Sequence, residues 1–169
     1  MRLFDDFINA NIEYAKTHPT EELAGPPVKK VAILTCMDAR LDPAKILGLR
    51  AGDAHVIRNA GGRASEDAVR SLVISQMMLG TQAIVVIHHT DCGMVRFSND
   101  ELWDRLQDHY GVDATDIDFL PFDEVGPSVV EDVRILRAHP LIPDDIPIRG
   151  FVWNVRTGFL EEVAEAHIN

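Results

Sequence analysis

The fold is decided by the stretch AIVVIHHTDCGM, residues 83–94. Its first five residues are apolar and mostly β-branched, which predicts a buried strand over residues 83–88. The strand leads directly into a segment that contains His, Asp, Cys and Gly, so reactive side chains lie where the strand ends. In open α/β sheets ligands bind at this edge, and the stretch therefore predicts a site as well as a strand.

A second apolar run ends beside the only other cysteine of the chain. Residues 28–35 include the run VAIL at 31–34 and predict a strand, and Cys36 follows it. Carboxyl ends of parallel strands meet at one edge of a sheet. We therefore expect Cys36 and Cys92 to lie on neighbouring segments.

The rest of the chain alternates predicted strands with predicted helices. Further strands are predicted over 54–57 and 148–155, and helices over 3–17, 44–49, 66–79, after Ser98 and from Ser128. The helix starts are predicted from capping residues, namely Asp42 before Pro43, Ser65, and the pairs Ser98–Glu101 and Ser128–Glu131. Residues 111–124 are acidic and irregular, and residues 159–163 form either a hairpin partner or a last helical turn. This alternation predicts a single α/β domain over residues 1–169, with a mostly parallel central sheet of four to five strands flanked by helices.

Size, charge and composition narrow the class of protein. With 169 residues, a hydrophobic fraction of 46% and a charged fraction of 25%, the chain fits one globular domain. Its net charge of −11 argues against nucleic acid or an anionic membrane as the main partner. We expect neither a signal peptide nor a membrane span, and two cysteines are too few for a disulfide framework. The expected location is therefore cytoplasmic, where the thiols stay reduced.

Cys36, His89 and Cys92 supply two thiolates and one imidazole, a ligand set that suits zinc. Three protein ligands leave a fourth position for water, which distinguishes catalytic from structural zinc sites. His88 is a poor fourth ligand because adjacent residues of a strand point to opposite faces. From the residues alone two alternatives stay open: buried structural cysteines, and redox-active or nucleophilic cysteines.

Asp38 and Arg40 follow the first proposed ligand at positions i+2 and i+4. In an extended segment they would share a face with Cys36, and a carboxylate beside a guanidinium forms a bidentate pair. Such a pair can aim the carboxylate at a water on the metal. The alternative is a surface salt bridge without a functional role.

Four further residues are candidates for the lining of the substrate pocket: Gly93, Asn59, Ala60 and Gly61. Gly93 would allow close approach of the backbone to the metal. A simple turn explains the adjacent glycines at 61 and 62 equally well. His88 and His55 lie near strand ends and are weak candidates for proton transfer, since a structural role suits both better.

Taken together, these motifs resemble those of the beta-class carbonic anhydrases. That family carries C-x-D-x-R followed by H-x2-C-G, and this chain has CMDAR at 36–40 and HTDCG at 89–93. The resemblance extends to RNAGG at 58–62 and GFVWNVRTG at 150–158, so it covers the chain from about residue 28 to 165.

The resemblance implies roles for the residues that match the motifs. Cys36, His89 and Cys92 match the zinc ligands, and Asp38 and Arg40 match the catalytic pair. In some family members the matching aspartate swings onto zinc as a fourth ligand, so Asp38 is a candidate for that closed form. The implied reaction is reversible hydration of CO2 to bicarbonate and a proton by attack of zinc-bound hydroxide.

The family also implies an assembly, a homodimer or a tetramer, in which the N-terminal helix packs on a partner subunit. The apolar side of the predicted helix within residues 1–17 is compatible with that role, although a helix folded on its own domain gives the same pattern.

Two other functions stay open at this point. The same ligands would serve an enzyme that hydrolyses carbonyl sulfide or carbon disulfide, in which only the shape of the pocket differs. A non-catalytic, zinc-stabilised binding protein would hold Asp38 as a permanent fourth ligand. A dinucleotide-binding enzyme is disfavoured because the chain has no G-x-G-x-x-G motif.

Overall fold

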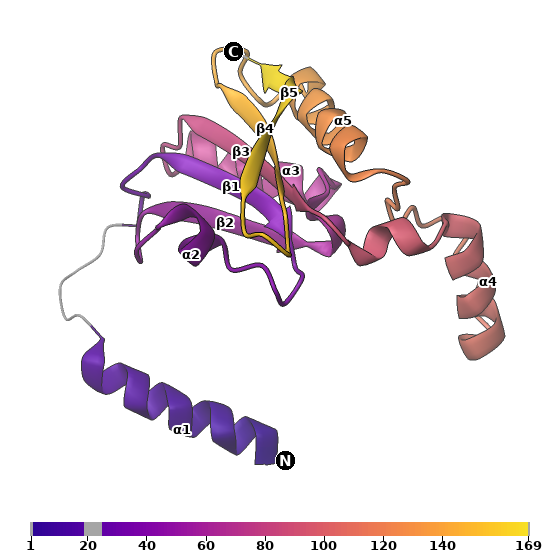
Figure 1. Cartoon of the computed structure of the whole chain (residues 1–169), viewed down its shortest axis with the longest axis horizontal. Coiled ribbons are helices and arrows are strands. Elements are labelled where there is room, and N and C mark those ends of the chain that lie inside the picture. The colour runs from indigo at the N-terminus through magenta and orange to yellow at the C-terminus, as the bar shows by residue number, and fades with distance from the viewer. Residues whose placement is uncertain (1, 19–24, 169) are drawn as a thin grey trace.

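The computed structural model describes residues 2–18 and 25–168. In this part of the chain one five-stranded sheet has the order β2-β1-β3-β4-β5 (Figure 1). Its strands are β1 (Val31–Cys36), β2 (Ala54–Asn59), β3 (Ala83–His89), β4 (Ile148–Trp153) and β5 (Leu160–Ile168). The strands β2, β1, β3 and β4 run parallel to one another, and β5 pairs with β4 in the antiparallel sense. The predicted α/β fold with a mostly parallel sheet is confirmed.

The two faces of the sheet bury two separate apolar clusters. On one face Leu34 and Val86 pack with residues of α3 (Glu66–Met77) and α5 (Val125–Ala138). On the other face Ile33 and Ile87 pack with α2 (Pro43–Leu47) and with Trp153. Neighbouring strand residues alternate between these clusters because the side chains of a strand point to opposite faces.

Three of the four predicted caps are confirmed. The side chain of Asp42 accepts from the Lys45 N–H, that of Ser65 accepts from the Ala68 N–H, and Ser98 forms a capping box with Glu101 at the start of α4 (Asn99–Tyr110).

The fourth predicted cap is wrong. The helix α5 starts at Val125, and Ser128 is buried in its first turn, where its hydroxyl donates to the carbonyl of Val125. Pro127 is compatible with this earlier start because the first turn of a helix needs no N–H donors.

Two strand boundaries also differ from the prediction. β1 begins at Val31 rather than at residue 28, because residues 28–30 form a turn in which Lys30 has a φ of 51°. β4 ends at Trp153 rather than at 155, because residues 154–157 turn the chain towards β5. Of the two alternatives for residues 159–163, the hairpin partner is correct, and the strand is longer than predicted.

The helix α1 (Arg2–Thr17) lies apart from the sheet (Figure 1) and has no buried residue in its described length. Its large apolar side chains are all exposed: Leu3, Phe4, Phe7, Ile8, Ile12 and Tyr14. The predicted helix is confirmed, and its apolar side is left without a cover within the described residues. No helix of the described part of the chain has the length and apolarity needed to cross a bilayer.

Candidate metal centre

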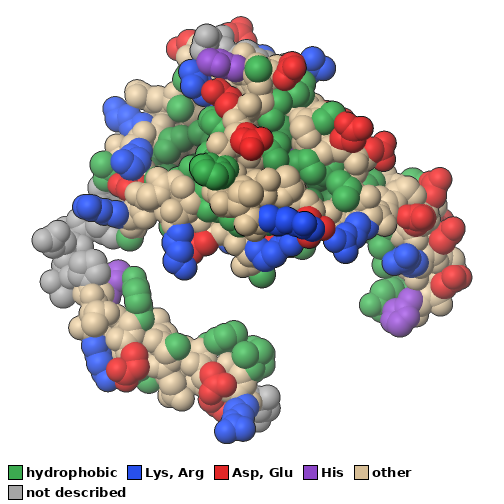
Figure 2. All heavy atoms as spheres, in the orientation of Figure 1, with side chains coloured by type: hydrophobic (Ala, Val, Ile, Leu, Met, Phe, Trp, Pro, Cys, Tyr) green, Lys and Arg blue, Asp and Glu red, His purple; other side chains and the backbone are tan. Residues whose placement is uncertain are grey.

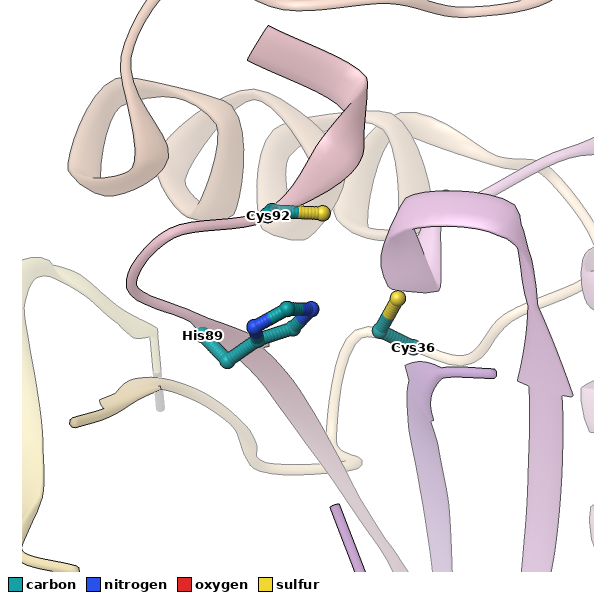
Figure 3. Close-up of side chains that lie close together, drawn as sticks. All are labelled: Cys36, His89 and Cys92. Carbon is teal, nitrogen blue, oxygen red and sulfur yellow. The ribbon is translucent and has the colours of Figure 1, made fainter. Parts of the chain in front are cut away.

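The structure brings Cys36, His89 and Cys92 together at the carboxyl end of the sheet (Figure 3). One ligand atom from each side chain lies within 4.8 Å of the other two, and all three residues are buried. Cys36 ends β1 and His89 ends the adjacent parallel strand β3, so the sheet itself places these two side chains. Asp91, with a φ of 56°, then turns the chain so that Cys92 returns to the same place.

The ring of His89 is oriented for metal binding. Its Nδ1 lies 2.9 Å from the carbonyl of Thr90, an acceptor, so Nδ1 carries the proton and donates it. The Nε2 atom is therefore left with a free lone pair, and it is buried without a hydrogen-bond partner among the described residues. A backbone carbonyl on one nitrogen and an unpaired second nitrogen is the arrangement of a metal-binding histidine.

The two thiols lie within 4.8 Å of each other, and each shifts the pKa of the other. The interaction with the Cys92 thiol is the main cause that lowers the pKa of Cys36 to about 4. The same interaction and burial raise the pKa of Cys92. One thiolate thus forms readily, and the positive charge of a metal ion would stabilise the second. The donor set and the unpaired nitrogen together fit a metal that prefers sulfur and nitrogen ligands.

Asp38 and Arg40 form the predicted bidentate pair. The Arg40 side chain donates from Nε to Oδ1 at 2.9 Å and from Nη2 to Oδ2 at 2.8 Å. These hydrogen bonds are the main reason that the pKa of Asp38 lies well below its usual range. Oδ2 also lies 3.7 Å from Nε2 of His89, which places the carboxylate beside the ligand atoms.

The backbone conformation that forms this pair differs from the extended segment that was predicted. Residues 38–41 form a turn closed by the Leu41 N–H, which donates to the carbonyl of Asp38 at 3.0 Å. The N–H of Arg40 donates to Oδ1 at 2.9 Å, so the side chain of Asp38 folds back over its own turn.

Asp91 and Arg96 are part of this arrangement and were missed by sequence reasoning. Arg40 donates from Nη1 to Oδ2 of Asp91 at 2.9 Å and from Nη2 to the Asp91 carbonyl at 3.0 Å. Arg96 donates to the other oxygen of Asp91 at 2.6 Å. Negative and positive side chains therefore alternate in the order Asp38, Arg40, Asp91, Arg96. Asp91 holds the side of the Arg40 guanidinium that faces away from Asp38. The only signal in the sequence was the position of Asp91 inside the HTDCG segment.

In the predicted pocket loop, Gly61 is tightly packed beside Met94 and Phe122. Gly61 has a φ of 80°, and an added Cβ would lie 3.1 Å from Met94 and 3.2 Å from Phe122. Asn59 instead braces the loop from within, since its Nδ2 donates to the carbonyl of Arg63 at 2.7 Å. Ala60 is exposed in the short 3-10 turn Ala60–Gly62.

Gly93 is not required for close packing. A Cβ there would meet no protein atom within 4 Å among the described residues, so no protein neighbour requires a glycine at this position, and the close approach to a metal stays a prediction. Gly62, the last residue of the same loop, is the constrained position: its Cβ would lie 2.9 Å from the backbone nitrogen of Cys36.

His88 and His55, the two histidines considered above for proton transfer, do not lie at the mouth of the site. His88 is fully buried, and its ring contacts Ser128 and Asp132 of α5. Nδ1 of His55 lies 2.7 Å from the hydroxyl of Ser75 in α3. The weak interpretation of His88 as a proton carrier at the mouth is wrong because no surface of its ring is exposed.

Comparison with known proteins identifies close relatives of the whole chain. The carbonic anhydrase family profile matches residues 31–112. Beta-carbonic anhydrase 1 of Mycobacterium tuberculosis is 44% identical over 167 residues, covering 96% of this chain and 99% of the relative. The crystal structure of carbonic anhydrase from Streptococcus mutans superposes with a TM-score of 0.93 at 52% identity, covering 96% of this chain and 98% of that one. Carbon disulfide hydrolase of Saccharolobus solfataricus is 33% identical, covering 92% of this chain and 88% of the relative.

Proposed function

The chain belongs to the beta-class carbonic anhydrases, and from this membership and its centre we propose that it catalyses the reversible hydration of CO2 to bicarbonate and a proton. The observation that carries the proposal is the Cys36–His89–Cys92 cluster, whose ligand atoms lie within 4.8 Å of one another beside the Asp38 carboxylate. Three buried ligand atoms beside a carboxylate match an open catalytic metal site.

Zinc is the metal that this donor set suits best, because two thiolates and one imidazole are typical tetrahedral zinc ligands. When bound, a zinc ion lowers the pKa of a water ligand to about 7 and so supplies a nucleophile at neutral pH. Cys36, His89 and Cys92 would hold the ion, and the carbonyl of Thr90 keeps the His89 ring in the tautomer that binding needs.

Asp38 would orient the attacking water. Its carboxylate is held ionised by Arg40 and lies beside the ligand atom of His89, so Oδ2 is placed to accept a hydrogen bond from a water at the open position. Both of its oxygens already accept from Arg40. This pairing supports the open form, in which Asp38 stays off the metal, over the closed form.

Carbon disulfide hydrolysis is the second candidate. The carbon disulfide hydrolases among the relatives are 31% to 35% identical to this chain, whereas the two carbonic anhydrases reported above are 44% and 52% identical. Hydration of CO2 is therefore the better-supported reaction. Turnover of CO2, carbonyl sulfide and carbon disulfide by one zinc-loaded preparation would rank the substrates directly.

We also propose that the chain assembles as a homo-oligomer in which α1 packs on a second copy. The apolar side of α1, residues 3–14, is exposed and covers no surface of its own sheet in the described structure. Contiguous apolar surface of this kind marks an interface in a water-soluble fold.

The deciding experiment is stopped-flow CO2 hydration between pH 6.5 and 9 with zinc analysis of the same sample. We expect one zinc per chain and rapid hydration, and loss of both zinc and activity in Cys36→Ser, His89→Ala and Cys92→Ser. One zinc per chain without hydration activity would support the non-catalytic, zinc-stabilised protein instead. Unchanged zinc content in all three variants would show that these residues are not the zinc ligands.

A further inference from the structure

A second group of buried polar side chains lies behind the metal centre, on the opposite face of β3. Its members His88, Arg63 and Asp132 are 0%, 3% and 1% exposed. Buried charges are costly unless they are paired and hydrogen-bonded, so such a group needs a reason to persist in a core. Nothing in the chemistry described above uses it.

Asp132 joins three parts of the chain. Its Oδ1 accepts from the Ala64 N–H at 3.0 Å, and its Oδ2 lies 3.0 Å from Nε of Arg63. Oδ2 also lies 3.1 Å from Nε2 of His88. Asp132 belongs to α5, His88 to β3, and Arg63 and Ala64 end the loop that begins after β2. One carboxylate therefore pins this loop between a helix and the central strand.

The ring of His88 holds the same loop at Gly62. Its Nε2 lies 3.2 Å from the Gly62 carbonyl, and its Nδ1 lies 2.7 Å from the Ser128 hydroxyl. Because Nε2 faces only acceptors, the Gly62 carbonyl and the Asp132 carboxylate, this nitrogen carries a proton and donates. The loop is thus held from behind by a ring whose orientation is set at both nitrogens.

The front of the loop touches the first metal ligand. A Cβ on Gly62 would lie 2.9 Å from the Cys36 nitrogen and 2.9 Å from the carbonyl carbon of Thr35, so the loop packs directly on the backbone that carries the Cys36 thiol. Phe122 closes the side: its ring stacks on His88 with centroids 5.6 Å apart and lies 3.2 Å from the Cβ position of Gly61. A loop packed this closely transmits any displacement to Cys36.

We propose that Asp132 is a positioning residue for the metal centre. Through Arg63, Ala64 and His88 it fixes residues 61–62, and Gly62 in turn packs against the backbone of Cys36, which carries the ligand sulfur. The inference rests on the proposed function, because it assumes that Cys36 holds the metal.

The test uses the full chain with cobalt(II) in place of zinc, because the sulfur-to-cobalt charge-transfer band reports the geometry of the metal–sulfur bonds. In Asp132→Asn we expect a shifted and weakened band, and about tenfold weaker zinc binding in competition with a chelator. The matched control is Val133→Ala, which removes buried packing from the adjacent residue of α5 and leaves the carboxylate of Asp132 in place. It should lower stability while leaving the band and the zinc affinity at their wild-type values.

A second variant keeps the test valid if Asp132→Asn fails to fold, since that substitution removes one of the two carboxylates that pair with the buried Arg63. The double variant Arg63→Met/Asp132→Leu removes both charges, and exchanges of this kind are often tolerated. It still deprives the Ala64 N–H of its acceptor, so we expect the same shifted band. A wild-type band and affinity in either folded variant would overturn the role of Asp132. Failure of the wild-type protein to show a thiolate–cobalt band would instead contradict the proposed metal centre.

Discussion

Both carboxylate oxygens of Asp38 accept a hydrogen bond from the guanidinium of Arg40, at 2.9 Å from Nε and 2.8 Å from Nη2. Bidentate pairs of this kind fix orientation as well as charge. Because the side chain of Asp38 is only 18% exposed and lies 3.7 Å from the His89 ligand atom, the pair joins the surface to the buried centre.

Figure 2 shows several basic side chains gathered along one edge of the body of this otherwise acidic chain.

Replacing Asp38 by Asn should separate catalysis from metal binding. The variant keeps the shape of the side chain and removes the charge that we expect to orient water. We predict a fall in kcat of about 100-fold or more, the range typical for a lost proton acceptor, with zinc content unchanged. Stopped-flow hydration and metal analysis on the same sample would measure both. Full activity in Asp38→Asn would exclude the carboxylate from the mechanism.

The carboxylate of Asp38 should stay ionised well into the acid pH range. Hydrogen bonds from Arg40 lower the pKa of Asp38, so the stabilisation from this pair is present above the unfolded pKa of about 3.9 and is lost as the pH falls towards the folded value. We predict that the carboxyl 13C chemical shift of Asp38 stays constant between pH 7 and 4.5. In Arg40→Gln the titration should move up towards about pH 3.9. A titration of Asp38 above pH 5 in the wild-type protein would contradict the pairing.

Asp91 should matter through Arg40 rather than through the metal. Its carboxylate and its carbonyl both accept from the Arg40 guanidinium, so its loss frees one side of the pair. Asn is the suitable replacement because Asp91 has a φ of 56°, a conformation that Asn tolerates better than Ala. We predict that Asp91→Asn lowers kcat about 3-fold to 10-fold, less than Asp38→Asn, with zinc content unchanged.

The control for this variant is Asp108→Asn, which makes the same chemical change at an exposed position on α4. It should leave kcat at the wild-type value. Equal effects of the two substitutions would show that overall charge, and not the contact with Arg40, is responsible.

The clustering of Cys36, His89 and Cys92 could be predicted from the sequence because two adjacent apolar strands each end at or near a cysteine, and parallel strands bring such ends together. The contact between Arg40 and Asp91 could not, because it depends on the left-handed backbone of Asp91 and on the turn at residues 38–41. The start of α5 was missed for a related reason. A serine followed by Glu three residues later has the pattern of a cap, whereas tertiary packing against His88 gives Ser128 a different role.

The apolar side of α1 should hold the assembly together. Phe4 and Phe7 are 67% and 60% exposed on a helix that covers none of its own sheet in the described structure, so burial against a second copy would remove a large apolar area from water. We predict that Phe4→Asp/Phe7→Asp lowers the molar mass measured by light scattering on a sizing column, while the metal centre keeps its zinc. The matched control is Asn9→Asp, which adds negative charge to a polar position of the same helix and should leave the mass unchanged. An unchanged oligomer in the double variant would mean that α1 does not form the subunit contact, and that another surface carries any assembly.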